Sequence, residues 1–180
     1  MQGIWAENFH EIIEALRNNA DLLQSVKNLI ETREITGKSL EGGNRLCVFK
    51  DILTNLVDGN IGLEESYMMV ETKISRYSSI HGSNNRVFPE SWGERLIRTN
   101  LSKFYNQAVL LYILESGKDN CYIPHSKYEQ GSQCSYMAGK THNAKEMLQK
   151  IEQAYEKGIF SKEFKIPDHP HCTHVVMPVE

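Results

Sequence analysis

The residues best suited to chemistry lie in the last fifty positions of the chain, where cysteines and histidines stand in two separate segments. Cys134 occupies a turn-like stretch, and His169-Pro170-His171-Cys172-Thr173-His174 follows near the C-terminus. Thiolate sulfur and imidazole nitrogen are ligands of tetrahedral zinc, which can hold a loop-rich segment together. These residues could therefore close around zinc. The alternative interpretation is buried thiols and surface histidines that bind no metal.

Composition is that of a soluble globular protein with a real hydrophobic core. The chain has 180 residues, of which 40% are hydrophobic and 24% are charged, so we expect one compact unit. The formal net charge is −3, without the basic surplus that binding to nucleic-acid phosphates usually requires. Nucleic acid is therefore not the expected main partner.

The cysteines point to a reducing compartment. The chain opens with an amphipathic helical pattern rather than a secretory signal, and no apolar run approaches the ~20 residues that cross a bilayer. We expect no membrane association and a location in the host cytoplasm or in a virion. In reducing cytoplasm thiols bind metal or lie buried, so a disulfide is the less favoured expectation for Cys47, Cys121, Cys134 and Cys172.

Apolar residues recur at helical spacing through the N-terminal half. One stripe runs over residues 4–30, a second helix is expected over residues 46–56 and a third from Leu63. Residues 78–89 read as a loop. A long core helix is predicted from Ser91, with Glu94 completing a capping box, to an end at Gly117.

The pattern changes after Gly117. We predict a short strand at residues 121–123, a helix over residues 143–157 and a closing strand over residues 173–179. The expected fold class is α+β and mostly α. A helical N-terminal half with a long central helix would precede a small α+β unit with short strands.

The order of four motifs resembles that of the phage Mu F-like minor head (head morphogenesis) proteins. Residues 94–108 are similar to the family's "ARTE…AYN" helix, and an aromatic strand would start at Tyr122. Residues 134–140 (CSYMAGK) fall on the second half of a CxxCxxLxGK segment. Residues 167–174 (PDHPHCTH) fall on a closing HPxCRC motif, and Met177-Pro178-Val179 falls on the terminal strand. The resemblance implies a head-morphogenesis domain over residues 59–180, preceded by an N-terminal helical segment over residues 1–58.

The chain departs from the family pattern at several positions. Gly131 replaces the first cysteine of the pair, His174 replaces the last cysteine of the closing motif, Lys127 stands at a usually acidic position, and Asn100 replaces a glutamate. A rearranged structural zinc site of Cys134, His169, Cys172 and His174 would still provide two sulfurs and two imidazoles. His169 reaches such a site only if the chain turns at Pro170. His142, His125 or Cys121 could substitute for one of the four.

The favoured function follows from the resemblance: a structural, protein-binding phage or prophage protein acting in capsid assembly or DNA delivery. Its expected partners are portal or capsid proteins or further copies of itself, and we do not expect an enzyme. One alternative is a small metal-dependent or Cys–His hydrolase or nuclease, toxin-like, that uses the C-terminal Cys/His cluster. Another is a regulatory or antiphage protein-interaction module. An enzyme predicts a solvent-open cluster with a carboxylate nearby, whereas a structural site predicts a closed one.

Overall fold

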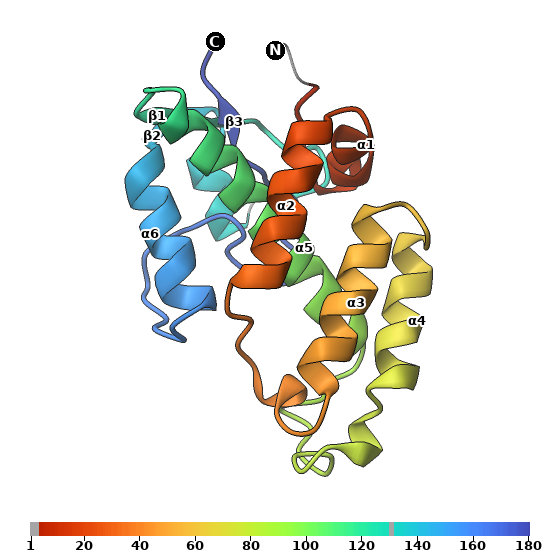
Figure 1. Cartoon of the computed structure of the whole chain (residues 1–180). Helices are drawn as coiled ribbons and strands as arrows, with labels where there is room; N and C mark the ends of the chain where they lie inside the picture. Colours follow the sequence, from red (N-terminus) through yellow and green to blue (C-terminus); the bar gives the residue numbers. More distant parts are fainter. Residues whose placement is uncertain (1–3, 130–131) are drawn as a thin grey trace.

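The computed structural model describes residues 4–129 and 132–180, and it confirms the α+β, mostly α fold (Figure 1). Its helices are α1 (Ile12–Arg17), α2 (Ala20–Thr32), α3 (Arg45–Val57), α4 (Leu63–Lys73), α5 (Trp92–Glu115) and α6 (Ala144–Tyr155). Its strands are β1 (Asn120–Ile123), β2 (Lys140–Asn143) and β3 (Met177–Pro178).

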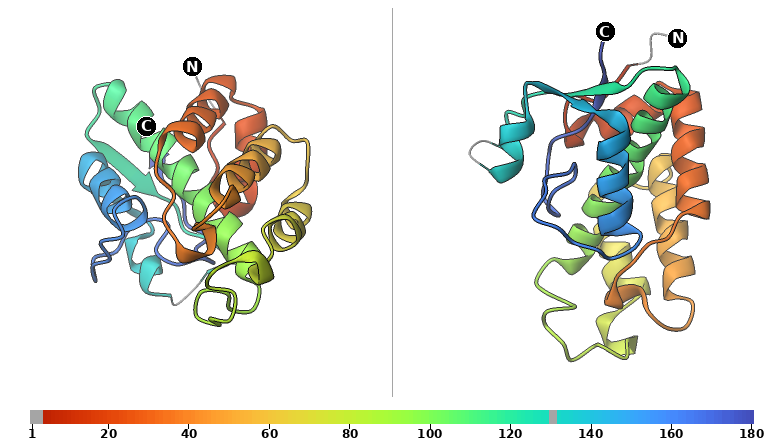
Figure 2. Two further views of the ribbon diagram at one scale, coloured as in Figure 1. Left: turned by 60° about the horizontal axis from the view of Figure 1, so that its bottom comes forward. Right: turned by 90° about the vertical axis from the view of Figure 1, so that its left-hand side faces the viewer.

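Helix α5 is the centre of the molecule. It contacts α2 and α4 as well as α6, β1 and β3, and two further views show the other elements arranged around it (Figure 2). Side chains on nearly its whole circumference are buried, including Ile97, Phe104 and Val109. A helix that is buried nearly all round is typical of the interior of a fold. The predicted long core helix is thus present and has this position.

The predicted continuous helical stripe over residues 4–30 is instead broken into α1 and α2. The chain leaves the helical conformation at Asn18 and Asn19, and the Asn19 side chain accepts a hydrogen bond from the Leu22 N–H at 3.1 Å. Asparagine is a favoured N-cap because its oxygen binds an amide that the helix leaves free. Both helices still bury residues of the predicted stripe, such as Leu16 of α1 and Val26 of α2.

The predicted capping box at the start of α5 is wrong, whereas the predicted end is confirmed. Ser91 has a left-handed backbone (φ 56) and its side chain makes no capping hydrogen bond. At the other end, Gly117 has φ 73 and the Lys118 N–H donates to the Ile113 carbonyl at 3.1 Å. That bond closes a Schellman turn, for which glycine is the preferred residue.

The C-terminal unit contains a three-stranded antiparallel sheet in the order β2-β1-β3. The strand at residues 121–123 is confirmed, and β2 was not predicted. The closing strand is much shorter than the expected residues 173–179, because only Met177 and Pro178 pair with β1. The Val176 N–H donates instead to the Asn106 side chain of α5 at 2.9 Å.

The N-terminal and C-terminal segments share one core. The Ala6 N–H donates to the Tyr105 hydroxyl and the Phe9 N–H donates to the Thr173 carbonyl, each at 2.8 Å. Buried apolar side chains from both predicted segments form a single cluster. The boundary near residue 58 stays a prediction. Within the described part of the chain, no helix has the length and apolar character needed to cross a membrane.

Lys103 is a buried charge in this core. Its ammonium donates to the Glu34 carbonyl at 2.8 Å and lies 4.1 Å from the centre of the Phe104 ring. Burial lowers the pKa of this ammonium from 10.5 to about 8, because the charged form loses hydration. The folded state therefore releases the Lys103 proton at a lower pH than the unfolded state does.

The lowered pKa of Lys103 predicts that the free energy of unfolding depends on pH. Between pH 8 and 10.5 the unfolded chain binds more protons at Lys103, so the free energy of unfolding contributed by this residue rises with pH. Relative to Lys103→Met, wild type should gain about 2 kcal/mol in stability between pH 7 and pH 10. Urea titrations of both proteins across this range measure it. If the difference in unfolding free energy between the two proteins stayed constant with pH, Lys103 would have an ordinary pKa.

Candidate metal centre

Cys134 is placed by a tight loop that returns to the sheet. It lies in a short 3-10 helix over Gln133–Met137 and is fully buried. After this helix the Gly139 N–H donates to the Ile123 carbonyl at 2.7 Å. Gly139 has φ 72, and a Cβ there would lie 2.3 Å from His125 Nε2, so only glycine fits. The positive φ and the close approach of His125 thus explain why glycine occupies position 139.

The second half of the site comes from the segment before β3. The Cys172 N–H donates to the His169 carbonyl at 3.0 Å, which closes a turn at Pro170 and His171. This is the turn that the sequence required for His169 to approach the site. Cys172 and His174 lie in irregular backbone rather than in the predicted strand, yet both side chains are buried and near each other.

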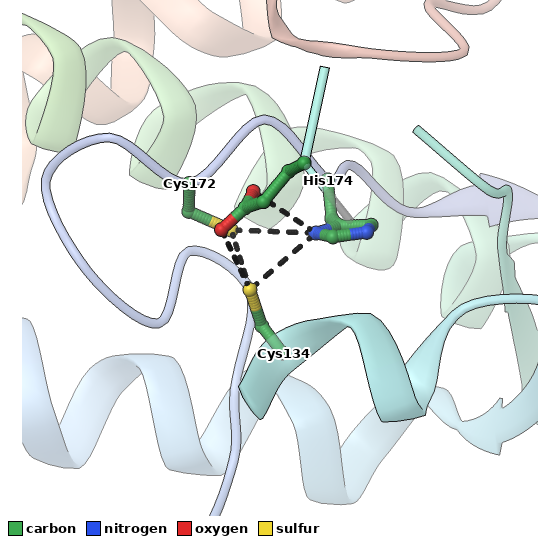
Figure 3. A group of neighbouring side chains, drawn as sticks. Cys134, Cys172 and His174 are labelled. Atoms are coloured by element: carbon green, nitrogen blue, oxygen red, sulfur yellow. Dashed lines mark hydrogen bonds and ion pairs between the residues drawn. The ribbon is translucent and has the colours of Figure 1, made fainter. Parts of the chain in front are cut away.

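Four side chains converge between these two segments (Figure 3). Glu129, Cys134, Cys172 and His174 each offer one ligand atom, and these atoms all lie within 4.8 Å of one another. Cys134 Sγ is 3.8 Å from Cys172 Sγ, 3.5 Å from His174 Nδ1 and 3.1 Å from Glu129 Oε1. The expected approach of the two sulfurs is therefore confirmed. Both cysteines are free thiols.

These separations fit the edges of a tetrahedron around zinc. With Zn–S near 2.3 Å and Zn–N near 2.05 Å, ideal edges are about 3.8 Å between two sulfurs and about 3.6 Å between sulfur and nitrogen. The S–S edge in the structure is 3.8 Å and the two S–N edges are 3.5 and 4.0 Å. His174 Nδ1 is 3.2 Å from Glu129 Oε2. The donor set and its spacing therefore fit a metal ion.

Glu129 is held firmly as a carboxylate. Its Oε2 accepts hydrogen bonds from the Thr173 N–H at 2.7 Å and from the Thr173 hydroxyl at 3.0 Å. Burial alone would raise the pKa of Glu129, but the Thr173 N–H, the Cys134 thiol and nearby His169 outweigh it and lower the pKa to about 2. A negative charge is thus fixed beside the two sulfurs.

His169 lies at the edge of this group rather than within it. Its Nε2 is hydrogen-bonded to Glu129 Oε1 and is 3.5 Å from Cys134 Sγ, while its side chain is 38% exposed. The hydrogen bond to Cys134 and the charge of Glu129 raise the pKa of His169, although burial opposes this. Three of the four predicted ligands thus meet, and the Glu129 carboxylate, which was not among the predicted ligands, accompanies them.

None of the substitute ligands named from the sequence belongs to this group, although His125 lines the cavity beside it. Cys121 is buried in β1 and pairs with His142 of β2 across the sheet. His142 Nε2 is hydrogen-bonded to the Met137 carbonyl at 2.8 Å, and the His125 ring fills the space over Gly139. Gly131, which stands where the family has its first cysteine, lies outside the described residues.

The two sulfurs of the centre are closed off from solvent, whereas a surface cavity borders Glu129 and His174. Cys134, Cys172 and His174 are at most 1% exposed, and the Glu129 side chain is 10% exposed. A surface cavity is lined by His125, Ser126, Lys127, Glu129, Ser135, Ala138 and His174. In the part of the chain that the structure describes, His174 Nε2 is buried without a hydrogen-bond partner.

Without metal, Cys134 is a poor nucleophile. Its hydrogen bond with Cys172 and its burial raise the pKa of the Cys134 thiol to about 12, although the two histidines act in the opposite direction. The thiolate is the reactive form of cysteine, and it is scarce at neutral pH when the pKa is raised. The arrangement is therefore better suited to binding a metal than to Cys–His catalysis.

No family model, curated protein or solved structure was found to match the chain.

The geometry predicts that Glu129 would contribute more than His169 to the binding of a zinc ion added at this centre. Glu129→Gln replaces a charged ligand by a weak neutral one, whereas His169→Gln removes a residue that supports that ligand. We expect Glu129→Gln to raise the zinc Kd about tenfold more than His169→Gln does. Competition with a chromophoric chelator measures both constants. A larger effect of His169→Gln would restore the ligand set predicted from the sequence.

Proposed function

We propose that the protein is a phage- or prophage-type minor head protein whose C-terminal unit is fastened by a structural zinc ion. One observation carries this proposal. The two segments that resemble the family's cysteine motifs, residues 134–140 and residues 167–174, supply Cys134, Cys172 and His174 to a single buried group. The residues that carry the resemblance are thus the residues that meet in space.

The donor atoms favour zinc over the common oxygen-bound cations. Two thiols and an imidazole are soft or borderline ligands, which bind zinc well and bind magnesium or calcium poorly. A carboxylate is an accepted fourth zinc ligand. When bound, the ion would join the loop after β1 to the segment before β3. Between those segments the sheet has only the short β1–β3 pairing.

The proposed role is binding rather than catalysis. The two sulfurs and His174 are buried, which is typical of a structural site whose ligands fill the coordination sphere. Portal or capsid proteins, or further copies of the chain, are the proposed partners. The net charge of −3 accords with a surface that contacts protein more than DNA.

A metal-dependent hydrolase is the second candidate, and one observation favours it. The cavity beside the centre is bordered by Glu129 and His174, so a substrate would approach the ion from that side. Catalysis would require a water molecule on the ion in place of one protein ligand. Glu129 would then have to leave the ion and act as the base, while two hydrogen bonds from Thr173 hold it in place. The structural role is therefore the first choice.

The zinc proposal predicts a stoichiometry and a local loss of order. Purified protein should contain about one zinc per chain, because the site offers one set of four ligands. Removal of the ion by EDTA should lower the Tm and raise hydrogen exchange in residues 132–139 and 167–174, while α3 and α4 stay protected. Elemental analysis and hydrogen-exchange mass spectrometry measure these effects.

Cysteine variants provide the matched control. Cys134→Ser and Cys172→Ser should both lose the zinc, whereas Cys47→Ser should keep it, since Cys47 is exposed on α3 and does not belong to the group. Metal-free wild type with the same Tm and exchange pattern as zinc-loaded protein would leave the site without a structural role.

The head-protein proposal predicts binding to a portal. Zinc-loaded full-length chain should co-sediment with the portal protein encoded in the same genome. Cys134→Ser should weaken this binding because the C-terminal unit loses its fastening, and Cys47→Ser should not. A genome without portal, terminase or capsid genes, or a portal that does not bind the zinc-loaded chain, would refute the assignment and leave the zinc site intact.

A further inference from the structure

A second recessed surface lies away from the metal centre, and we call it the α5 groove. It has a volume of about 580 Å³. The first half of α5, which we call its floor, and the segments that follow α2 and α6, which we call its walls, line the groove. Its lining comes from residues 36–41, 86–89, 92–100 and 155–160 and from Pro170. The groove thus joins segments that are distant in sequence.

The α5 groove is positively charged although the whole chain is acidic. Lys38, Arg86 and Arg95 line it, and none of them takes part in an ion pair within residues 4–129 and 132–180. The one acidic lining residue, Glu41, is bound to His81 at 2.7 Å. Basic side chains normally find acidic neighbours on a protein that has an excess of acids. Their collection in one groove makes it electrostatically complementary to an acidic ligand.

The floor and rim of the groove also offer apolar contacts. Trp92 and Leu96 of α5 and Tyr155 of α6 belong to the lining, as does Phe160, which is 68% exposed. An exposed phenylalanine in the same groove as two arginines is typical of a binding surface, because aromatic residues and arginine are enriched where proteins meet. A matching ligand must therefore carry apolar groups between its negative charges.

The walls of the groove are held in place before any ligand binds. The buried Arg45 side chain donates to the Ser39 carbonyl at 2.8 Å and to the Ile74 carbonyl at 2.6 Å, which fixes the segment that carries Lys38. On the opposite wall the chain reverses at Gly158, which has φ 69. A preformed groove binds its ligand with less loss of conformational entropy.

We propose that the α5 groove binds an extended, acidic segment of a partner protein, in which glutamate or aspartate residues flank apolar side chains. The basic residues would pair with the carboxylates, and Trp92, Tyr155 and Phe160 would receive the apolar side chains. Three basic residues are few for a nucleic acid, which is held through many phosphates at once. The proposal rests on the groove alone and stands without the metal centre or the head-protein role.

The test uses the full chain in a Trp5→Phe background, so that fluorescence reports Trp92 in the groove floor. The probe is a short synthetic peptide in which glutamates flank a phenylalanine and a leucine. Its saturable binding should shift the Trp92 emission. Arg86→Gln combined with Arg95→Gln should weaken the binding by about tenfold or more, because two charge-assisted contacts are lost.

A matched variant controls for net charge. Lys73→Gln combined with Lys145→Gln removes two exposed lysines from α4 and α6, outside the groove, and should leave the Kd unchanged. A peptide with glutamine in place of glutamate should bind at least tenfold more weakly. Equal binding of the two peptides, or an equal loss in both double variants, would overturn the proposal. Tighter binding of oligothymidylate than of the acidic peptide would replace it with a nucleic-acid site.

Discussion

The C-terminal third of the chain depends on the burial of four polar groups that meet between two segments distant in sequence. A carboxylate, two sulfurs and an imidazole nitrogen meet within 4.8 Å. Burying such groups costs free energy that hydrogen bonds must offset. Here the offset within the protein comes mainly from Thr173, which donates twice to Glu129. A bound cation would replace the hydrogen bonds among the two thiols and Glu129, because cysteines bind a metal as thiolates.

Thr173 also connects the centre to the rest of the fold. Its N–H binds Glu129, its carbonyl accepts from the Phe9 N–H, and its hydroxyl is 2.8 Å from the Ser126 hydroxyl. Three residues later, the Val176 N–H donates to Asn106 of α5, whose own amide is held by Ser102. The segment before β3 is thus fixed by side chains and by the N-terminal segment rather than by a long strand. Displacing it would disturb the first helices and α5 together.

The sequence predicted those parts of the fold that depend on apolar periodicity, and it failed where a single polar contact decides. Helix α5 was recognisable because its apolar residues recur at helical spacing over many turns. Strand β2 was missed because Lys140–Asn143 is polar and mostly exposed, so it lacks the alternation that marks a half-buried strand. The prediction of a capping box at Ser91 was wrong. Ser91 has a left-handed backbone, and its side chain makes no hydrogen bond to the amides of the helix.

The residues of the candidate centre were likewise predictable only in part. The chain has few cysteines, so Cys134 and Cys172 were easily recognised as candidates. The order of the motifs then predicted that their two segments meet. Glutamates are common, and nothing in the sequence separates Glu129 from its neighbours except that it precedes Cys134 by five residues. Its role follows from hydrogen bonds donated by Thr173, a residue 44 positions away. Such long-range contacts have no local signal in one sequence.

Because Glu129 rather than His169 belongs to the group, the position of His169 beside it has an electrostatic explanation. A zinc ion with two thiolates, a carboxylate and a neutral imidazole has a net charge of −1, which is costly to bury. A protonated His169 against Glu129 Oε1 would cancel that charge while remaining partly open to water. A residue that supports a ligand in this way orients it and tunes its basicity. The imidazole predicted as a ligand would then serve the metal from outside the coordination sphere, which leaves the four nearer atoms to surround it.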